Sequence, residues 1–281
     1  MSAFKFGLIG QNIAYSKSPA IFKVIFESKQ VEGEFDIIDV KPEQFGKRMA
    51  SLAKHGYRGI SVTVPYKETI IKYTSKLDRR AKVIGAVNSL VFDGDIVLGY
   101  NTDSYGFALP LKEHQQTLSG GAAILIGNGG SARAVAYSLS YDFGIRQIFV
   151  AGRNDKHLDI FKANMAKSLS GVNMETVLLN HLNEYAQSSK ISLVVNCTPL
   201  GGPNHADESP VPDEFTWPRE GIYYDLNYNT NNCTLGLARE AGIKVIDGRR
   251  MLVGQALRSY WLWTGQDVSF NNIYEKMDFD G

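Results

Sequence analysis

A lysine follows an apolar segment in the sequence GISVTVPYKE. Residues 59–64 have the composition of a buried strand, and Pro65 is typical of the first turn of a helix, so we predict that Lys67 lies close to a helix N-terminus. The helix dipole disfavours an ammonium group there, so Lys67 should release its proton more readily than an exposed lysine does. Such a proton suits the reduction of a ketone. The alternative is an ordinary exposed lysine that tolerates a small electrostatic penalty.

A carboxylate lies at the end of a second segment that resembles a strand, VLGYNTDSYGF. Asp103 follows the polar turn and precedes the next helical pattern. Aspartate and threonine are both favoured as N-cap residues, so the role of Thr102 or Asp103 could be only to accept hydrogen bonds from helix amides. The spacing alone does not distinguish a chemical role from capping.

Four further polar side chains lie beside apolar patterns. Ser18 immediately precedes Pro19, and this order predicts an N-cap at Ser18. Ser16 lies in the loop after a strand, where its hydroxyl is either available to a ligand or part of an ordinary loop. Asn88 and Gln255 carry amides beside strand and helix patterns, and most such amides satisfy nearby backbone groups. None of these residues identifies a site by itself.

A glycine-rich turn between a predicted strand and a predicted helix is the most informative local pattern, in AAILIGNGGSARAVAYSLSYDFGIRQIFVAGRN. Gly127 permits a tight turn, Gly129 lets the backbone approach a pyrophosphate, and Ala132 is small enough for close packing of helix and strand. The amides at the helix N-terminus then face the phosphates. A plain turn is the alternative, but the order of strand, turn and helix favours a dinucleotide site.

The end of the next predicted strand bears on which dinucleotide binds. An NAD site usually has a carboxylate there for the ribose hydroxyls, whereas this chain has Arg153 after Ala151 and Gly152. A guanidinium suits a 2′-phosphate, so the sequence favours NADP. Asp155 lies two residues further on and could hold the ribose instead, which keeps NAD as an alternative. A solvated surface arginine is the third interpretation.

Short apolar runs bounded by glycine alternate with longer stretches that have apolar residues at helical spacing. We predict helices over 19–28 and over MLVGQALRSYWLWTG. The predicted strands are 4–10, 35–40, 59–64, 89–92, 96–99, 122–127, 147–151, 193–197, 222–226 and 244–246. This alternation is typical of mostly parallel sheets covered by helices, because parallel strands need crossover connections. The predicted fold class is therefore α/β.

The length of 281 residues is about twice that of a typical domain, which favours two domains. A boundary is expected near residues 104–120, where a helix start turns into a polar stretch that ends in glycine. We therefore predict one domain over 1–105, completed by 250–281, and a second over 106–249. The aromatic residues of the C-terminal helix should pack against the first domain.

The composition excludes several classes of protein. The 30 basic and 29 acidic residues leave a net charge of +1 without a basic cluster, which argues against nucleic-acid binding. Two cysteines provide neither a disulfide framework nor a zinc pattern, and reduced thiols in a cytoplasm are the simplest interpretation. No segment approaches the length of an apolar membrane span, so we expect a soluble cytoplasmic protein without a metal site. A homodimer is compatible with the sequence, which does not determine the oligomeric state.

Taken in order, eight segments resemble the shikimate dehydrogenase family over nearly the whole chain: YSKSP, GISVTVPYK, GAVNSL, GYNTD, GNGGSARA, NCTPLG, DLNYN and MLVGQALRSYWLWTG. The resemblance implies a Rossmann-type domain and a substrate domain completed by C-terminal helices, with Lys67 and Asp103 as the catalytic pair. The implied substrate residues are Ser16, Ser18, Ser61, Thr63, Asn88, Tyr228 and Gln255. The implied cofactor residues are Gly127, Asn128, Gly129, Gly130, Ser131, Ala132, Arg153, Asn154, Asp155, Thr198, Leu226 and Gly248.

Several positions depart from the family pattern. Tyr15 replaces a histidine, Ser61 an asparagine, Ser89 a threonine, Gly152 an asparagine and Gly202 a methionine. The change at position 61 matters most, because a shorter side chain near the pocket could alter which ring substituents are accepted.

The resemblance implies an NADP-dependent dehydrogenase that reduces 3-dehydroshikimate to shikimate reversibly. A quinate or dual quinate and shikimate dehydrogenase that uses NAD or NADP is the enzyme alternative, motivated by Ser61 and Asp155. A homologue that binds shikimate without turnover is a third reading, which the presence of Lys67 and Asp103 disfavours.

Overall fold

The computed structural model describes residues 4–188, 190–229 and 232–279. They form two compact units. The first comprises the residues up to Gly106 together with Leu252–Asp278, and the second comprises Phe107–Met251 and Phe279. The chain passes between the units within α4 (Asp103–Leu111) and α10 (Arg249–Thr264). In the described ranges, no helix has both the length and the apolar character that crossing a membrane requires.

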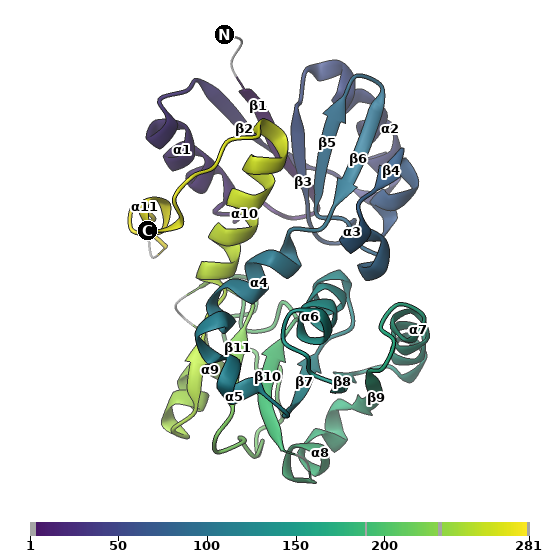
Figure 1. Ribbon diagram of the computed structural model, residues 1–281, viewed down its shortest axis with the longest axis vertical. Helices are drawn as coiled ribbons and strands as arrows, with labels where there is room; N and C mark the ends of the chain where they lie inside the picture. Colours follow the sequence, from purple (N-terminus) through teal and green to yellow (C-terminus); the bar gives the residue numbers. More distant parts are fainter. Residues whose placement is uncertain (1–3, 189, 230–231, 280–281) are drawn as a thin grey trace. The chain divides into compact units, whose positions relative to one another are not determined.

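A six-stranded mixed sheet forms the centre of the first unit (Figure 1). Its strands are β1 (Phe4–Gly10), β2 (Gly33–Asp39), β3 (Gly59–Val62), β4 (Lys76–Leu77), β5 (Ser89–Asp93) and β6 (Ile96–Tyr100), in the order β2-β1-β3-β5-β6-β4. The other helices are α1 (Ser18–Lys29), α2 (Pro42–Leu52), α3 (Arg79–Ile84) and α11 (Phe270–Tyr274), with 3-10 helices η1 (Ala53–His55) and η2 (Thr69–Tyr73). Strands β3, β5 and β6 pair antiparallel, and the other pairs are parallel.

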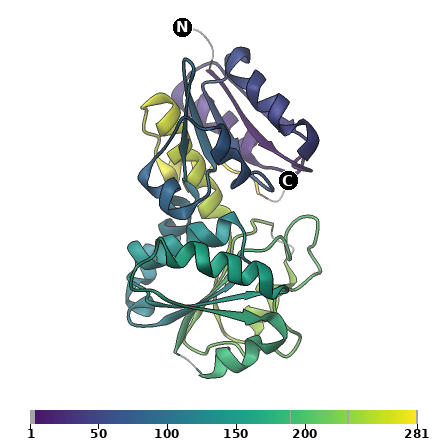
Figure 2. The same cartoon turned by 90° about the vertical axis from the view of Figure 1, so that its right-hand side faces the viewer.

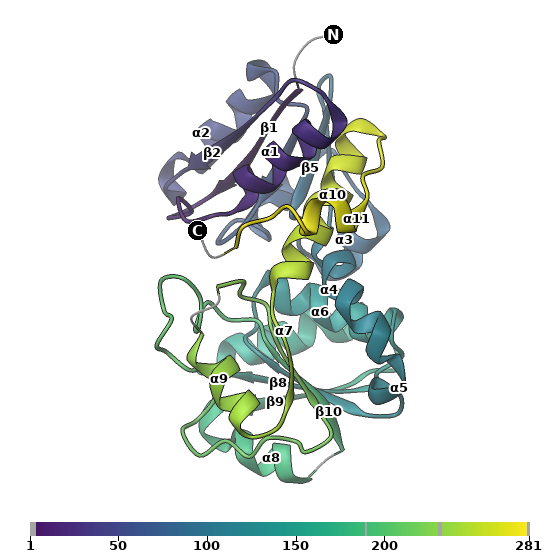
Figure 3. The same cartoon turned by 90° about the vertical axis from the view of Figure 1, so that its left-hand side faces the viewer.

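Aromatic side chains fill one face of this sheet, where α1 and α10 lie side by side (Figure 3). The ring centroids of Phe6 in β1 and Trp263 in α10 are 4.7 Å apart, and those of Phe22 in α1 and Trp263 are 5.3 Å apart. The expected packing of the C-terminal aromatic residues against the first unit is thus confirmed. The opposite face packs against α2 through a buried cluster that includes Phe45, Met49 and Leu52.

A parallel sheet of six strands forms the second unit. Its strands are β7 (Ala122–Ile126), β8 (Gln147–Gly152), β9 (Asn173–Leu178), β10 (Ile191–Asn196), β11 (Ile222–Asp225) and β12 (Lys244–Ile246), in the order β12-β11-β10-β7-β8-β9. The helices are α5 (Gln115–Leu118), α6 (Gly130–Tyr141), α7 (Asp155–Ala166), α8 (Leu182–Ser188) and α9 (Cys233–Glu240), with 3-10 helices η3 (Lys112–His114) and η4 (Leu179–His181).

Helices cover both faces of the second sheet, with α6 on one face and α8 on the other (Figure 2). Between the sheet and helices α8 and α9 lies a cluster of buried hydrophobic residues that includes Leu182, Val194 and Leu235. On the other face, α6 buries Val135 and Leu139 completely. Because the strands are parallel and covered on both sides, their carboxyl ends share one edge, where loops are free to build a binding site.

The α/β fold class is confirmed, and each predicted strand is present, with unchanged bounds for 4–10 and 244–246 and with ends shifted by one to a few residues for the others. Two strands were missed: β4 has only two residues, and β9 is a polar edge strand without an apolar run. The strand expected over 59–64 ends at Val62, because a turn with a cis peptide bond between Val64 and Pro65 follows it. The hairpin of β5 and β6 turns at Gly94, which has φ of 57°.

Gly59 is the position in β3 where the aromatic core tolerates no side chain. A Cβ atom built there would lie 2.3 Å from the indole ring of Trp263. The glycine therefore lets α10 approach the sheet closely, and real Cβ atoms do not make contacts that short.

We predict that Gly59→Ala lowers the free energy of unfolding by about 1–3 kcal/mol, because the methyl group overpacks a closed aromatic core. Urea unfolding followed by circular dichroism measures this loss. Gly236→Ala is the matched control, since a Cβ atom at that helical position meets nothing within 4 Å, and it should be neutral or slightly stabilising. Equal stability of the Gly59 variant and the wild type would contradict the packing argument.

Candidate active site

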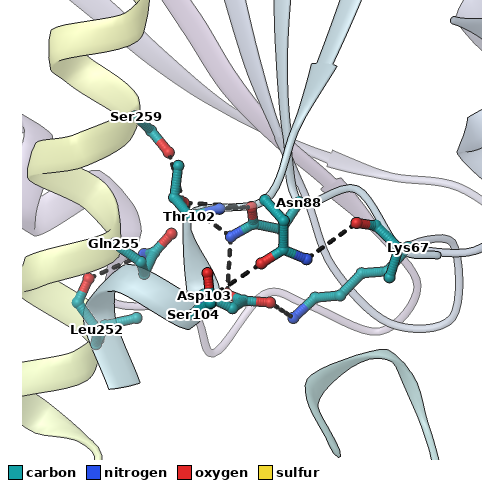
Figure 4. A network of polar contacts seen from close by, with 10 residues as sticks. Lys67, Asn88, Thr102, Asp103, Ser104, Leu252, Gln255 and Ser259 are labelled. Atoms are coloured by element: carbon teal, nitrogen blue, oxygen red, sulfur yellow. Dashed lines mark hydrogen bonds and ion pairs between the residues drawn. The ribbon is translucent and has the colours of Figure 1, made fainter. Parts of the chain in front are cut away.

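Lys67 and Asp103 form a close ion pair in the first unit (Figure 4). Lys67 Nζ lies 2.6 Å from Asp103 Oδ2, and the two side chains are 14% and 6% exposed. A pair with so little exposure is shielded from solvent, so its geometry depends on neighbouring hydrogen bonds rather than on water. The arrangement keeps one amine and one carboxylate available for proton transfer at the same point.

The prediction that Pro65 belongs to the first turn of a helix is wrong. Lys67 lies in the turn after the cis Val64–Pro65 bond, and the following 3-10 helix begins only at Thr69. Proline at position 65 starts a turn here, so the proposed effect of a helix dipole does not apply. Instead, the Lys67 carbonyl accepts a hydrogen bond from Val87 N at 2.8 Å, which ties the lysine backbone to the segment that precedes β5.

Asn88 connects the ion pair to the rest of the unit. Its Nδ2 donates to Asp103 Oδ1 at 2.7 Å and to Thr102 Oγ1 at 2.9 Å, and its Oδ1 accepts from Thr102 N at 2.6 Å. The carboxylate requires a donor and the backbone N–H requires an acceptor, so the two partners fix which end of the amide is nitrogen. Asn88 is 3% exposed, and it holds the Asp103 carboxylate in one orientation.

The capping role considered for Thr102 and Asp103 belongs to another residue. Asn101 Oδ1 accepts from Ser104 N at 3.3 Å at the start of α4, while the side chains of Thr102 and Asp103 point into the polar network. Thr102 Oγ1 also lies 3.1 Å from Ser259 Oγ on α10. Sequence reasoning missed Asn101 and Ser259, although Ser259 lies four residues after Gln255 and therefore on the same side of the helix.

Ser18 is not the N-cap of α1, because the helix begins at Ser18 itself and its cap position is Lys17. Ser16 Oγ accepts from Ser18 N at 3.2 Å and lies 3.2 Å from Ser18 Oγ, so both hydroxyls cluster at the start of α1. Gln255 donates from Nε2 to Leu252 O at 2.9 Å, which leaves its carbonyl oxygen for other partners.

Two more predicted substrate residues lie at the end of β3. Ser61 is 6% exposed and pairs across the sheet with Ser89, while Thr63 follows the strand and is partly exposed. Tyr228 belongs to the second unit and is partly exposed in the loop after β11. The structure thus brings Lys67, Asn88 and Asp103 into direct contact.

The glycine-rich turn joins β7 to α6 at the carboxyl edge of the second sheet. Gly127 has φ of 107°, which favours glycine, and Gly129 occupies the cap position of α6. A Cβ atom built on Gly129 would meet nothing within 4 Å, so the backbone there faces open space. Ala132 is fully buried in the first turn of the helix. Asn128, Gly130 and Ser131 complete the turn at the helix N-terminus, which is suited to an anion.

Arg153, Asn154 and Asp155 follow β8 at the same edge and are exposed. Asn154 Oδ1 accepts from His157 N at 3.2 Å, so this side chain caps α7. Asp155 is the first residue of that helix. A guanidinium and a carboxylate therefore lie at neighbouring positions beside the turn, one suited to a phosphate and the other to ribose hydroxyls.

Asp225 is a buried carboxylate that organises the rest of this edge. Its oxygens accept five hydrogen bonds, from side chains of Asn196, Asn227, Asn232 and Tyr223 and from Asn227 N. Burial raises the pKa of Asp225 above its ordinary value, and the surrounding donors oppose that rise. Sequence reasoning missed this residue, because a carboxylate at the end of a strand carries no signal of its burial.

The Asp225 network shapes the loops that contain three predicted cofactor residues. Asn196 Oδ1 accepts from Thr198 N at 2.9 Å, which fixes the loop after β10. A Cβ atom built on Gly248 would lie 2.1 Å from Leu226 O, so the loops after β11 and β12 are in contact. Thr198, Leu226 and Gly248 therefore gather at the edge where the glycine turn lies, and a Cβ atom on Gly127 would be 3.0 Å from Thr198 Cγ2.

The second unit defines the class of protein: a parallel, doubly wound sheet with a glycine turn at the switch between β7 and β10 is a Rossmann-type nucleotide-binding architecture. Two family models match the chain, a shikimate dehydrogenase substrate binding domain over residues 8–90 and shikimate / quinate 5-dehydrogenase over residues 110–200. The chain belongs to the shikimate dehydrogenase family.

Relatives and solved structures agree with this assignment. The NADP(+) shikimate dehydrogenase of Caldanaerobacter subterraneus subsp. tengcongensis is 33% identical over 277 residues, which cover 97% of this chain and 95% of the relative. The shikimate 5-dehydrogenase of Thermus thermophilus, solved with NADP(H) and shikimate, has a TM-score of 0.82 with 30% identity and covers 97% of both chains. Shikimate dehydrogenase 1 of Peptoclostridium difficile has a TM-score of 0.86 with 29% identity and covers 99% of this chain and all of the other.

We predict that Asp225→Asn lowers the free energy of unfolding by about 2–4 kcal/mol, because its amide group would face donors and leave buried groups unsatisfied. Chemical unfolding measures the loss. Asp247→Asn is the control: this aspartate pairs with Arg249, and the two side chains are partly exposed, at 19% and 30%, so the loss should be much smaller. If both variants lose the same free energy of unfolding, the hydrogen bonds of Asp225 do not stabilise the fold more than an ordinary ion pair does.

Proposed function

We propose that the protein is an NADP-dependent shikimate dehydrogenase that interconverts 3-dehydroshikimate and shikimate. The observation that carries the proposal is the shielded Lys67–Asp103 pair, with Asn88 holding the carboxylate, in a chain of the shikimate dehydrogenase family. The similar Thermus thermophilus enzyme was solved with NADP(H) and shikimate, which supports the choice of both ligands. We further propose that the first unit binds the substrate and the second the cofactor, and that the protein acts in the cytoplasm.

The residues at the edge of the second sheet fit a dinucleotide. The open space at Gly129 and the amides at the start of α6 would hold the pyrophosphate, with Gly127, Asn128, Gly130, Ser131 and Ala132 forming the turn. Arg153 would hold a 2′-phosphate, with Asn154, Asp155, Thr198, Leu226 and Gly248 around the site. When bound, NADPH supplies the hydride for the reduction.

Lys67 would supply the proton in the direction of reduction. An alkoxide left without a proton is a poor product near neutral pH, and the ammonium donates to that oxygen as charge develops. Asp103 stabilises the ammonium before transfer, and Asn88 keeps Asp103 turned toward it. In the direction of oxidation, the neutral amine accepts the proton from the shikimate hydroxyl. The shielding of the pair strengthens these interactions relative to water.

The remaining polar residues of the first unit would orient the ring acid. Ser16 and Ser18 present two hydroxyls at the start of α1, Thr63 follows β3, and Gln255 has a carbonyl oxygen outside its helix bond. Tyr228 of the second unit is proposed as a further substrate residue. Ser61 has a small buried side chain, and quinate is the alternative substrate because the second family model covers both acids.

Initial rates with shikimate and quinate, each with NADP and NAD, test the proposed function. We expect the highest kcat/KM for shikimate with NADP. Lys67→Ala should lower kcat by roughly 10²-fold or more, a typical range for a general acid or base. Thermal unfolding of the same variant checks that it folds. A decisive preference for quinate, or an unchanged kcat in the lysine variant, would overturn the corresponding part of the proposal.

Arg153→Ala should raise KM for NADP by roughly 10-fold or more while changing KM for NAD little, because only NADP carries the phosphate that the guanidinium would bind. Lys156→Ala, which removes a nearby exposed cation, is the control for general electrostatic attraction. If Arg153→Ala and Lys156→Ala weaken NADP to the same extent, Arg153 has no specific role.

A further inference from the structure

Ser259 is a fully buried hydroxyl on α10 that extends the network of the proton-transfer pair. Its Oγ lies 3.1 Å from Thr102 Oγ1, and this threonine is 2% exposed. Figure 4 shows Ser259 pointing from the helix toward Thr102, on the side opposite to Lys67. The helix neighbours of Ser259 include Ala256, Tyr260 and Trp263, which are buried hydrophobic residues, so a fully buried hydroxyl at this position needs a specific reason.

The reason follows from the hydrogens available in the network. The two hydrogens of Asn88 Nδ2 point to Asp103 Oδ1 and Thr102 Oγ1, so the Thr102 hydroxyl acts as an acceptor for the amide. The hydroxyl has one hydrogen of its own, which it directs to Ser259 Oγ or to Asn88 Oδ1 at 3.2 Å. Asn88 Oδ1 already accepts a shorter bond, of 2.6 Å, from Thr102 N.

Without Ser259, the Thr102 hydroxyl would have only the Asn88 side-chain amide as a partner. It would then have to accept from Asn88 Nδ2 and donate to Asn88 Oδ1 at the same time. One hydroxyl does not satisfy both bonds with good geometry, so the Asn88 amide would be held less firmly, mainly by its bonds to Thr102 N and Asp103 Oδ1. A less firmly held amide would loosen Asp103 Oδ1, and the other oxygen of the same carboxylate holds Lys67.

We propose that Ser259 is a positioning residue that sets the orientation of the proton-transfer pair through Thr102 and Asn88. The expected effect on kcat rests on the proposed function, whereas the contacts that lead from Ser259 through Thr102 to Asn88 lie within the first unit. Ser259 touches neither Lys67 nor Asp103, so it acts through the two residues between them. A purely structural hydroxyl would affect stability alone, whereas a positioning hydroxyl changes the geometry of the Lys67–Asp103 contact.

Ser259→Ala is the direct test, with two measurements. The first is the pH dependence of kcat for shikimate and 3-dehydroshikimate. We expect kcat to fall by roughly 3- to 30-fold, the range typical of coupled neighbours, with KM for NADP unchanged. The second is the NMR chemical shift of the Lys67 side chain, which requires no turnover. This shift should change, because a loosened carboxylate no longer contacts the ammonium in the same geometry.

Ser192→Ala is the matched control. Ser192 is also buried, and its hydroxyl donates to Ala122 O at 3.3 Å in the second unit, so the variant should lose stability without changing the Lys67 chemical shift or the pH profile. Ser259→Cys keeps a weak donor of similar size and should give an intermediate chemical shift and an intermediate kcat. It also serves as the test if the alanine variant does not fold.

Thr102→Val removes the same connection at the next residue. If Ser259 acts through Thr102, the double variant with Ser259→Ala should have the same Lys67 chemical shift as Thr102→Val alone. An unchanged Lys67 chemical shift in Ser259→Ala, or independent effects in the double variant, would overturn the positioning role. A wild type without shikimate turnover would instead contradict the proposed function, and the NMR measurement would still decide the role of Ser259.

Discussion

The buried amide of Asn88 is the contact on which the geometry of the candidate site depends. An ammonium and a carboxylate shielded from water lose hydration, so their attraction is useful only if other bonds fix their geometry. Asn88 supplies such a bond because hydrogen bonds to two strands, β3 and β6, hold its backbone in place. Asn88 N donates to Tyr100 O at 3.0 Å, and Asn88 O accepts from Val62 N at 2.8 Å. The antiparallel pairing around β5 therefore brings residue 88 beside Thr102 and Asp103.

Helix α10 has two roles in the first unit, and both depend on its close approach to the sheet. Its aromatic side chains complete the core that begins with Phe6 and Phe22 in the N-terminal segment. Trp263 Nε1 also donates to Ser89 Oγ at 3.1 Å, immediately beside Asn88 in the chain. A segment more than 150 residues away in sequence thus packs against the strand that carries the polar network. Packing and site geometry are consequently not separable in this unit.

The sequence predicted those features that depend on local patterns. Strand positions follow from short apolar runs, and the glycine turn follows from the conformations that only glycine adopts, so the fold class was predicted correctly. The predicted environment of Lys67 was wrong, because proline is common in turns as well as at helix starts. The contacts of Asn88 and the burial of Asp225 depend on strand pairing between distant segments, which no local pattern encodes. The family resemblance identified Lys67 and Asp103 as a pair, but it did not indicate the role proposed for Ser259.

The candidate proton-transfer site of the first unit and the candidate cofactor site of the second differ in how far their residues are buried. The carboxylate of Asp225 fixes the loops after β10 and β11 through hydrogen bonds from Asn196 and Asn232, which are themselves buried. Arg153 and Asp155 lie exposed at the same edge, and Asn154 between them is engaged in capping α7. Under the proposed function, in which Arg153 and Asp155 contact the cofactor, substitutions at these exposed positions should change cofactor choice at little cost in stability. The geometry of Lys67 and Asp103, in contrast, depends on the buried core of the first unit.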